Sequence, residues 1–243
     1  MSNVLVCPVA FNENVKLRNV IERFLKSGVR SRVDYLVVDD ASDDGTTEVI
    51  QDFSPQGVKT IKHERRQGVG AAIRTAIHYA RKQRYEVLVI MAGNNKDNPD
   101  EIPCLIDLII NEGYDFVQGS RYKGHEGIGG DMPLYRKAAT KIHPWLMSLI
   151  TKRKVTDSTN GFRALRLSIF DHQEINIDQP WLDHYEIEPY LLYKAITLGF
   201  KFSEASVTKI YPSRKVGYTK MRPLIGWWSI LRPLVYLGLG IKK

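Results

Sequence analysis

The segment LVVDDASDDGTTEVI, residues 36–50, decides how the rest of the chain is interpreted. Asp34–Val38 predict a short apolar strand that ends in Asp39-Asp40, and Thr46–Phe53 predict a helix. Ser42, with the two aspartates after it, predicts the N-cap of that helix, because such side chains accept hydrogen bonds from the first backbone N–H groups. A strand, a polar turn and a helix in this order indicate part of a βαβ unit.

The same alternation continues on both sides of this segment. Further strands are expected at Val4–Val9, Val58–Lys62 and Val87–Met91, with a fifth beginning at Phe116–Val117. Further helices are expected at about Val15–Lys26, Gly68–Arg84 and Pro99–Asn111. This pattern predicts an α/β fold with a mostly parallel sheet flanked by helices. Ligands of such sheets bind beyond the carboxyl ends of the strands, where this chain is polar, charged and rich in glycine.

The charge of the chain is unevenly distributed along its 243 residues. Residues 1–120 carry 15 basic and 17 acidic side chains, whereas residues 121–243 carry 20 basic and 10 acidic side chains. The basic second half predicts an anionic partner. The candidates are nucleic acid, an acidic membrane surface and a phosphate-bearing substrate. The sequence contains no nucleic-acid-binding motif, so a nucleic-acid partner is not expected. A composition of 43% hydrophobic and 26% charged residues is that of an ordinary globular protein.

The sequence predicts a protein of the cytoplasm that is soluble or peripheral to a membrane. Cys7 and Cys104 lie in apolar stretches, so both are expected to be buried and reduced. The N-terminus has no basic region before its short apolar run and is interpreted as a strand, not a signal peptide. No apolar stretch reaches the ~18–20 residues that a spanning helix needs.

Seven sequence blocks together resemble glycosyltransferase family 2. They are PVAFNEN (8–14), VDDASDDGT (38–46), QGVGAAIRTAI (67–77), MAGNNKDNPDEIP (91–103), GSRY (119–122), DSTNGFRAL (157–165) and YEIEPYLLYKAITLGFKFSE (185–204). The later blocks are most similar to polyprenyl-phosphate sugar transferases of the dolichol-phosphate mannose synthase type. The resemblance implies a GT-A fold, a nucleotide-diphosphate sugar as donor (a UDP- or GDP-sugar) and inversion at the anomeric carbon.

The resemblance also implies which residues bind the donor. Pro8, Phe11, Glu13 and Asp39 would form the base pocket, because carboxylates there accept hydrogen bonds from a base N–H or ribose hydroxyls. Asp40 would face the sugar or the diphosphate, although the two aspartates are also suited to cap a helix. Gly68 and Gly70 would let the backbone approach phosphate, or would only allow close packing of the turn.

The family normally places two aspartates after its fourth strand to hold Mg²⁺ or Mn²⁺, and here these positions are Ala92 and Asn94. Three interpretations follow. A metal is held mainly by the donor phosphates, with Asn94, Asp97 or Asp40 assisting. Alternatively, Lys96 and nearby arginines replace the metal, since cations also stabilise a departing diphosphate. In the third, the protein is a catalytically silent nucleotide-sugar-binding or scaffold protein.

The resemblance places Asp157 at the reacting sugar and acceptor. A hydroxyl acceptor would need a general base, for which Asp157, Glu186 and Glu188 are candidates. The two glutamates are expected on a helix from about Leu182 to Leu198 and, being two residues apart, only one should face the site. A phosphate acceptor would instead need cations, for which the candidates are Arg121, Arg163, Arg214, Lys215 and Lys220. Arg214 and Lys220 lie in a segment that resembles the family's loop over the donor and acceptor phosphates. The alternative is that this segment is only a solvated charged loop.

Residues 222–243 are expected to form an amphipathic helical segment after a catalytic domain of residues 1–221. Aromatic and basic side chains flank a short apolar stretch there, which suits the interface of a bilayer, and Pro233 is expected to break the helix. Packing on the core or a contact between copies of the chain are alternatives. The predicted function is sugar transfer to a polyprenyl phosphate or lipid-linked glycan at the cytoplasmic face of a membrane, in cell-surface polysaccharide or glycoconjugate synthesis.

Overall fold

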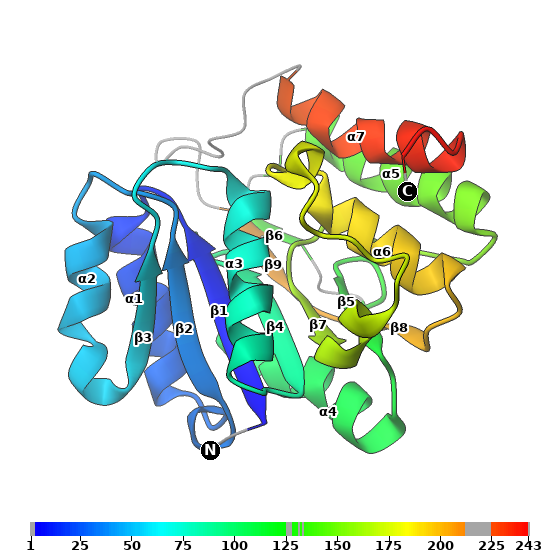
Figure 1. The fold of residues 1–243 in the computed structure, drawn as a ribbon. Coiled ribbons are helices and arrows are strands. Elements are labelled where there is room, and N and C mark those ends of the chain that lie inside the picture. Colours follow the sequence, from blue (N-terminus) through cyan, green and yellow to red (C-terminus); the bar gives the residue numbers. More distant parts are fainter. Residues whose placement is uncertain (1–2, 125–127, 131, 133, 212–224, 243) are drawn as a thin grey trace.

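A seven-stranded sheet forms the centre of the protein (Figure 1). The computed structural model describes residues 3–124, 128–130, 132, 134–211 and 225–242. The strand order is β3-β2-β1-β4-β7-β5-β8, and all neighbours are parallel except β7, which runs antiparallel to β4 and β5. The strands are β1 (Val4–Ala10), β2 (Asp34–Asp39), β3 (Val58–Lys62), β4 (Val87–Ala92), β5 (Phe116–Ser120), β7 (Arg163–Arg166) and β8 (Phe202–Ser206).

Helices cover both faces of this sheet because its inner strands are apolar on both sides. Leu5 and Cys7 of β1 pack in one core cluster with α3 (Val69–Lys82) and α6 (Ile187–Thr197). Val4 and Val6 pack in the other cluster, whose helices are α1 (Asn14–Lys26), α2 (Thr46–Asp52) and α4 (Ile102–Glu112). Alternate residues of one strand thus serve opposite cores. The predicted α/β class, with a mostly parallel sheet flanked by helices, is confirmed.

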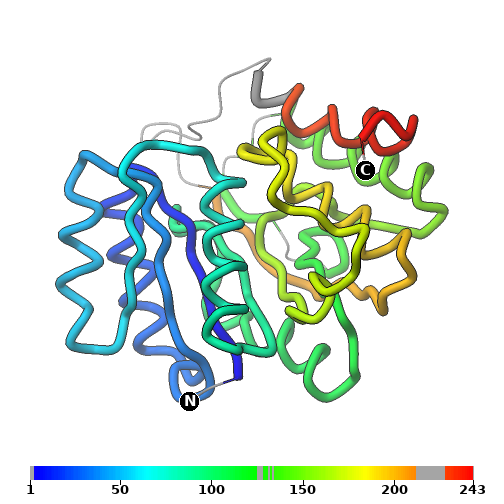
Figure 2. Tube along the Cα trace, in the orientation of Figure 1, coloured from blue at the N-terminus to red at the C-terminus, as the bar shows by residue number. Residues whose placement is uncertain are grey.

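The second half of the chain adds a helical layer and a small second sheet. Helices α5 (Leu134–Thr151) and α7 (Ile225–Gly238) lie side by side above α6 in Figure 1. Strand β6 (Ile128–Gly130) pairs in parallel with β9 (Lys209–Tyr211). In Figure 2 the segments coloured blue to cyan form one side of the molecule, and those coloured green to red form the other. Short 3₁₀ turns lie at Arg30–Arg32, Ser54–Gln56, Pro99–Glu101, Leu167–Asp171 and Pro180–Leu182.

Several local predictions differ from the structure. Pro233 does not break α7, which runs continuously from Ile225 to Gly238 because Leu234 and Leu237 are buried in the main core. Cys104 is exposed, not buried, since the apolar face of α4 is formed by other residues, Ile102, Leu105, Ile106 and Ile109. Cys7 is buried as expected. Within the described residues, no helix has both the length and the apolar character needed to cross a bilayer.

The remaining helix boundaries differ by small amounts. Helix α3 begins one residue after Gly68, and the segment from Pro99 forms a 3₁₀ turn before α4 begins at Ile102. Helix α6 begins at Ile187 and not at about Leu182, because a separate 3₁₀ turn, Pro180–Leu182, precedes it. The expected boundary between residues 221 and 222 lies outside the described residues.

Candidate active site

The sheet brings the predicted site segments to a single edge. Strands β1, β2, β4, β5 and β8 are parallel, so their carboxyl ends lie together. Strand β7 is antiparallel, so its first residue, Arg163, and the loop before it lie at the same edge. The edge therefore gathers residues 11–13, 39–42, 92–97, 119–122, 156–163 and 207–211. This is where ligands of parallel sheets bind.

Asp39 is fully buried and fixes the turn that follows β2. Its Oδ1 accepts hydrogen bonds from the backbone N–H of Ser42 at 3.0 Å and from the Ser42 hydroxyl at 2.5 Å. Its Oδ2 accepts one from the Thr47 hydroxyl at 2.6 Å. The prediction that Ser42 caps α2 is wrong, because its hydroxyl is bonded to Asp39. The N–H of Thr46, the first residue of α2, donates instead to Asp44 Oδ1 at 3.1 Å.

Asp40 holds the turn that leads into α3. Its carboxylate accepts hydrogen bonds from the backbone N–H groups of Gln67 and Gly68, both at 2.8 Å. His63 Nδ1 lies 2.8 Å from the same carboxylate, and His63 Nε2 lies 2.9 Å from the Thr75 hydroxyl. The contacts of Asp40 in the structure are thus to its own chain.

Gly68 and Gly70 let the start of α3 approach residues 182–184 closely. A Cβ at Gly70 would come within 3.0 Å of backbone atoms of these residues, and one at Gly68 would meet the His184 ring. Gly68 also has a φ of 111°, which side chains disfavour. The N–H of Ala71 donates to the Asp183 carbonyl at 3.0 Å. Both glycines therefore allow close packing of this turn, and an approach of phosphate to it stays a prediction.

The residues expected to form a base pocket lie around the ends of β1 and β2. Pro8 is buried within β1, opposite Met91 of β4. The guanidinium of Arg66 lies 4.0 Å from the centre of the Phe11 ring. The Glu13 carboxylate is 3.1 Å from Lys16 Nζ, and the Glu13 N–H donates to the Thr46 hydroxyl at 2.9 Å. Together with Asp39 they occupy one end of the carboxyl edge.

The loop after β4 contains a buried ion pair that the sequence did not reveal. Asp97 is 1% exposed; its Oδ2 accepts from the Ala92 N–H at 3.1 Å, and its Oδ1 lies 2.6 Å from Lys209 Nζ. Lys209 also donates to Asn160 Oδ1 at 2.8 Å. Lys209 stands on β9, which lies alongside this loop because the Ile210 N–H donates to the Lys96 carbonyl at 3.0 Å. The available signal was a lysine within the short segment VTKIY, residues 207–211, whose other residues favour β-strands.

The side chains around this loop do not fit a divalent metal ion. A hard cation needs several oxygen ligands, at least one of them a carboxylate available for coordination. Asp97 Oδ1 already forms an ion pair with the ammonium group of Lys209. Asn94 has only a neutral amide, and its oxygen accepts a hydrogen bond from the Lys96 N–H at 3.3 Å. In the part of the chain that the structure describes, no group of three His, Cys, Asp or Glu side chains is placed to hold a metal.

Cations gather instead around the ring of Tyr211. Lys96 Nζ lies 5.4 Å and the Arg136 guanidinium 5.8 Å from the ring centre, and Arg121 Nη1 donates to the Tyr211 hydroxyl at 2.7 Å. Burial lowers the pKa of Lys96 to about 8, and repulsion from Arg136, Lys209 and Lys16 contributes. Attraction from Glu13 is the weakest of these influences. The lowered pKa of Lys96 thus reflects mainly its burial, with a smaller contribution from neighbouring positive charges.

Asp157 and Arg121 form a bidentate ion pair beneath the edge. Arg121 Nε lies 2.6 Å from Asp157 Oδ2, and Arg121 Nη2 lies 2.7 Å from Oδ1; the two side chains are 3% and 0% exposed. Burial alone would lower the pKa of Arg121, but the charge and hydrogen bonds of Asp157 outweigh it and raise that pKa. Glu204 holds the loop by accepting from the Asp157 N–H at 3.0 Å.

Arg163, Glu186 and Glu188 are also paired inside the protein. Burial lowers the pKa of Arg163, and the nearby Glu188 opposes this; Arg163 Nη2 lies 3.3 Å from Glu188 Oε1. Glu186 is fully buried and forms an ion pair with Arg232, while the Ser229 hydroxyl donates to it at 2.5 Å. Glu186 thus faces α7, whereas Glu188 faces the 156–163 loop. Arg214, Lys215 and Lys220 lie outside the described residues.

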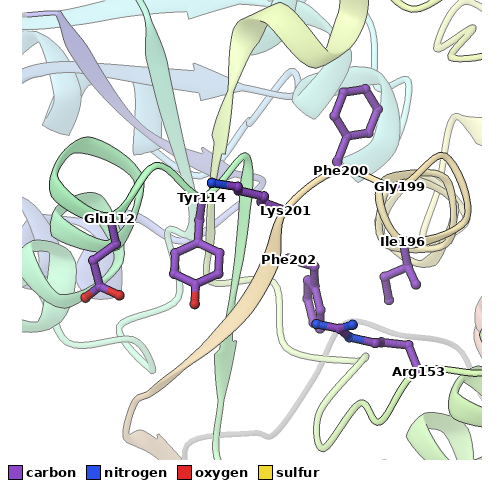
Figure 3. A pocket seen from close by; sticks show the side chains of 8 residues that line it. All are labelled: Glu112, Tyr114, Arg153, Ile196, Gly199, Phe200, Lys201 and Phe202. Carbon is purple, nitrogen blue, oxygen red and sulfur yellow. The ribbon is translucent and has the colours of Figure 1, made fainter.

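A separate pocket lies at the opposite edge of the sheet. A hollow of about 420 Å³ is lined by Glu112, Tyr114, Arg153, Ile196, Gly199, Phe200, Lys201 and Phe202 (Figure 3). These residues precede β5 and begin β8, so the hollow lies at the amino edge of the sheet, opposite the predicted site.

The fold of the chain is of the GT-A type, as comparison with a solved structure shows. The structure is similar to that of glucosyl-3-phosphoglycerate synthase from Mycobacterium tuberculosis in complex with Mn²⁺ and UDP-glucose, with a TM-score of 0.68. That likeness covers 99% of this chain and 80% of the other at 18% identity, so it concerns the fold. Residues 6–173 match the sequence model of glycosyl transferase family 2, and the chain belongs to this family.

Three relatives of the chain have names that refer to dolichyl, dolichol or polyprenol phosphates. The polyprenol monophosphomannose synthase of Mycolicibacterium smegmatis is 27% identical over 89% of this chain and 80% of its own length. The UDP-N-acetylglucosamine–dolichyl-phosphate N-acetylglucosaminyltransferase of Methanococcus voltae is 28% identical over 68% of this chain and 69% of its own. The dolichol-phosphate mannosyltransferase of Pyrococcus furiosus is 32% identical over 68% of this chain and 47% of its own length.

Proposed function

We propose that this family 2 glycosyltransferase moves a sugar from a UDP- or GDP-sugar to the phosphate of a polyprenyl phosphate, with inversion. One observation carries the choice of acceptor. The three carboxylates suited to act as general base are all bonded to cations: Asp157 to Arg121, Glu186 to Arg232 and Glu188 to Arg163. A hydroxyl acceptor needs a base, whereas a phosphate monoester is already anionic. The relatives that act on dolichyl and polyprenyl phosphates support the same acceptor class.

The proposed reaction is a single displacement. An oxygen of the acceptor phosphate attacks the anomeric carbon on the face opposite the nucleotide. The bond from that carbon to the β-phosphate oxygen breaks, and its electron pair leaves with the nucleoside diphosphate. No proton is transferred, and the configuration at the anomeric carbon inverts. The product is a polyprenyl-phosphate sugar for cell-surface polysaccharide or glycoconjugate synthesis.

Transfer of radiolabelled sugar from a panel of UDP- and GDP-sugars tests this proposal. Polyprenyl phosphate in detergent micelles is expected to be labelled with at least one donor, and the corresponding polyprenol is not, because the three candidate bases among the described residues, Asp157, Glu186 and Glu188, are each held by an arginine. Equal labelling of the polyprenol would contradict the phosphate acceptor. Tight nucleotide binding without transfer from any donor would favour the silent nucleotide-sugar-binding protein instead.

We further propose that α5 and α7 hold the enzyme against an anionic bilayer at the cytoplasmic face of the membrane. Each helix presents apolar side chains to solvent in a helical stripe, namely Tyr135, Ile142, Trp145 and Leu149 on α5 and Trp228, Leu231 and Val235 on α7. Exposed cations flank the α5 stripe: Lys137, Lys141, Lys152, Arg153 and Lys154. Apolar and basic groups side by side complement an anionic lipid surface.

The proposed membrane helices are connected to the candidate site. His143 of α5 is buried, which lowers its pKa to about 4, so it is neutral at pH 7. Its Nε2 donates to the Ile230 carbonyl of α7 at 3.1 Å, so its Nδ1 accepts from the Ser158 hydroxyl at 2.6 Å. Ser158 follows Asp157 directly. The buried face of α5 therefore contacts the Asp157 loop directly, while its exposed face carries the proposed membrane contact.

The double variant Trp145→Ser/Leu149→Ser is expected to lose binding to vesicles that contain anionic phospholipid. Both side chains are 64% exposed, and burying each in lipid is worth about 1.5–3 kcal/mol, so partitioning should fall at least about tenfold. Vesicle flotation measures it. The control is Val15→Ser/Ile110→Ser, which removes exposed apolar residues from α1 and α4 and should change nothing. If the Trp145→Ser/Leu149→Ser variant floats with vesicles as the wild type does, but loses a dimer that the wild type shows in gel filtration, the stripe on α5 joins two copies of the chain instead of binding lipid.

A further inference from the structure

Helix α7 is held on the protein by a buried polar contact as well as by apolar packing. It lies over α5 and α6, and its residues Leu234 and Leu237 belong to the main core (Figure 1). Between α6 and α7 the fully buried carboxylate of Glu186 forms an ion pair with Arg232. The Ser229 hydroxyl donates to the same carboxylate at 2.5 Å. One face of α7 therefore carries a cation and a hydroxyl that meet a single buried acid.

Stability alone does not explain this buried ion pair. Glu186 Oε2 and Arg232 Nε are buried, and among the described residues they have no hydrogen-bond partner. Buried polar atoms without partners destabilise a fold, and a buried ion pair is often no more stabilising than apolar side chains of similar size. The best-attested use of buried polar contacts between helices is to fix the register of one helix on another. The contact is therefore better explained by a requirement for one defined position of α7.

Helix α7 contacts both ends of the segment that precedes α6. Arg232 Nη2 donates to the Trp181 carbonyl at 3.2 Å. At the other end of the segment, the Tyr185 N–H donates to the Ser229 hydroxyl at 3.2 Å. The residues between these two points, 182–184, are the ones that pack on the start of α3. A shift of α7 along α6 would therefore disturb the backbone that supports the start of α3, at the carboxyl edge of the sheet.

A second set of contacts connects α7 with the loop before β7. The Ile230 carbonyl accepts a hydrogen bond from His143 Nε2 at 3.1 Å, and the Ser158 hydroxyl donates to His143 Nδ1 at 2.6 Å. Ile230 follows Ser229 directly in α7, so the register set by the buried ion pair also sets where this carbonyl meets the imidazole. One helix thus supports two segments of the candidate site that are far apart in the sequence.

We infer that Arg232 and Glu186 are positioning residues for the candidate site: they fix the register of α7, which in turn holds the start of α3 and the Asp157 loop. The inference rests on the proposed function for the reaction that these segments serve. The pair acts through other residues, since the Glu186 carboxylate is enclosed between α6 and α7. Small displacements of groups at a reacting centre lower the rate strongly, so the pair should affect kcat more than donor affinity.

Replacement of the ion pair by two apolar side chains, Glu186→Met/Arg232→Met, tests the inference. With polyprenyl phosphate as acceptor, kcat should fall at least about tenfold, because the two segments lose their fixed position. The Kd of UDP or GDP, measured by calorimetry, should change by less than about threefold. The urea midpoint should stay the same or rise, because no buried charge is left unpaired. A folded double variant with the kcat of the wild type would overturn the inference.

Hydrogen exchange of the backbone amides locates the effect of this double variant. The amides of residues 68–71 and 158–160 should exchange at least about tenfold faster than in the wild type, while those of β1 and β4 keep their rates. A global loss of stability would instead raise the exchange of all these amides together. Faster exchange spread evenly over the sheet and the two segments would therefore contradict a positioning role.

The matched control is Glu174→Met/Lys194→Met, which removes an ion pair between α6 and the segment after β7. Lys194 is largely buried like Glu186, but its partner does not belong to α7. This control should change kcat by less than about twofold. Arg232→Lys keeps the positive charge beside Glu186 and should retain kcat within about threefold of the wild type. A loss as large as that of the double variant would contradict the role of the ion pair.

Ser229→Ala provides a second variant in case the double variant does not fold. It removes the hydroxyl that joins the Tyr185 N–H to the Glu186 carboxylate and leaves the ion pair in place. Exchange at residues 68–71 should rise and kcat should fall about threefold. Wild-type values of both would overturn the inference.

The exchange measurement also separates this inference from the proposed function. If the wild type transfers no sugar to any acceptor, the proposed function is overturned. Faster exchange at residues 68–71 and 158–160 in the double variant would then still support the positioning of these segments by α7. Unchanged exchange there would overturn the positioning role, even where the wild type transfers sugar as proposed.

Discussion

Asp157→Asn is expected to lower the free energy of unfolding by about 3–5 kcal/mol, because it leaves the buried charge of Arg121 without its partner. The two side chains are 3% and 0% exposed and joined at 2.6 and 2.7 Å, so water does not replace the lost carboxylate charge. The remaining partners of Arg121, the hydroxyls of Tyr211 and Thr159, carry no charge. Urea denaturation of the variant and the wild type gives the difference.

An exposed ion pair of the same type provides the control. Arg18 and Asp52 are joined at 2.7 Å, but their side chains are 42% and 59% exposed. Asp52→Asn should therefore cost only about 0.2–1 kcal/mol. The double variant Arg121→Met/Asp157→Asn should be more stable than the sum of its single changes, since it removes the unpaired charge. A cost for Asp157→Asn no larger than for Asp52→Asn would show that water reaches the pair.

Gly70→Ala is expected to destabilise the protein by about 1–3 kcal/mol, although the same change inside a helix usually stabilises it by about 0.5–1 kcal/mol. The stability change has the opposite sign here because Gly70 lies against the backbone of residues 182–184. A Cβ at Gly70 would overlap the Leu182 carbonyl oxygen and come within 3.0 Å of backbone atoms of Asp183 and His184, which cannot move aside as a flexible side chain would. The segment from the Pro180–Leu182 turn into α6 would have to shift away from α3.

Gly28→Ala is the matched control for this substitution. No atom lies within 4 Å of a Cβ built on Gly28, and its φ is not in the positive range. The control should therefore be neutral or slightly stabilising through the unfolded state. Thermal and urea unfolding of both variants test the prediction, and a Gly70→Ala protein as stable as the wild type would show that the 182–184 backbone yields easily.

The strands of the first half were predictable because each is an apolar run with polar residues at both ends. The expected strand Val4–Val9 is Val4–Ala10 in the structure, and Val58–Lys62 has the expected bounds. Strand β7 was not predictable from its composition. Its four residues, RALR, include Arg163, whose charge argues against a central strand. Arg163 is accommodated there by carbonyl oxygens of Asn160 and Glu188, which only the folded chain brings together.

The position of the candidate site was predictable, but the pairing of its charges was not. Strand ends identified the segments around Asp39 and Asn94 because parallel strands place their carboxyl ends together, whereas the segment around Asp157 was indicated by the family resemblance. The ion pairs, however, join residues distant in sequence: Asp97 and Lys209 are 112 residues apart, and Arg121 and Asp157 are 36 apart. No local pattern indicates such contacts. In the structure Asp97 is the counter-ion of Lys209, and Asp157 is the counter-ion of Arg121.

The place of β7 in the sheet also has a consequence for synthesis of the chain. Strand β7, residues 163–166, separates β4 from β5, although both are made before it. When the ribosome has made only residues 1–120, one edge of β4 is paired with β1, but β7 is not yet available to pair with the other edge. The backbone N–H and C=O groups along that edge of an apolar strand then have no partner in the sheet. The nascent protein must therefore be protected from aggregation until about 40 further residues emerge and close the sheet from within.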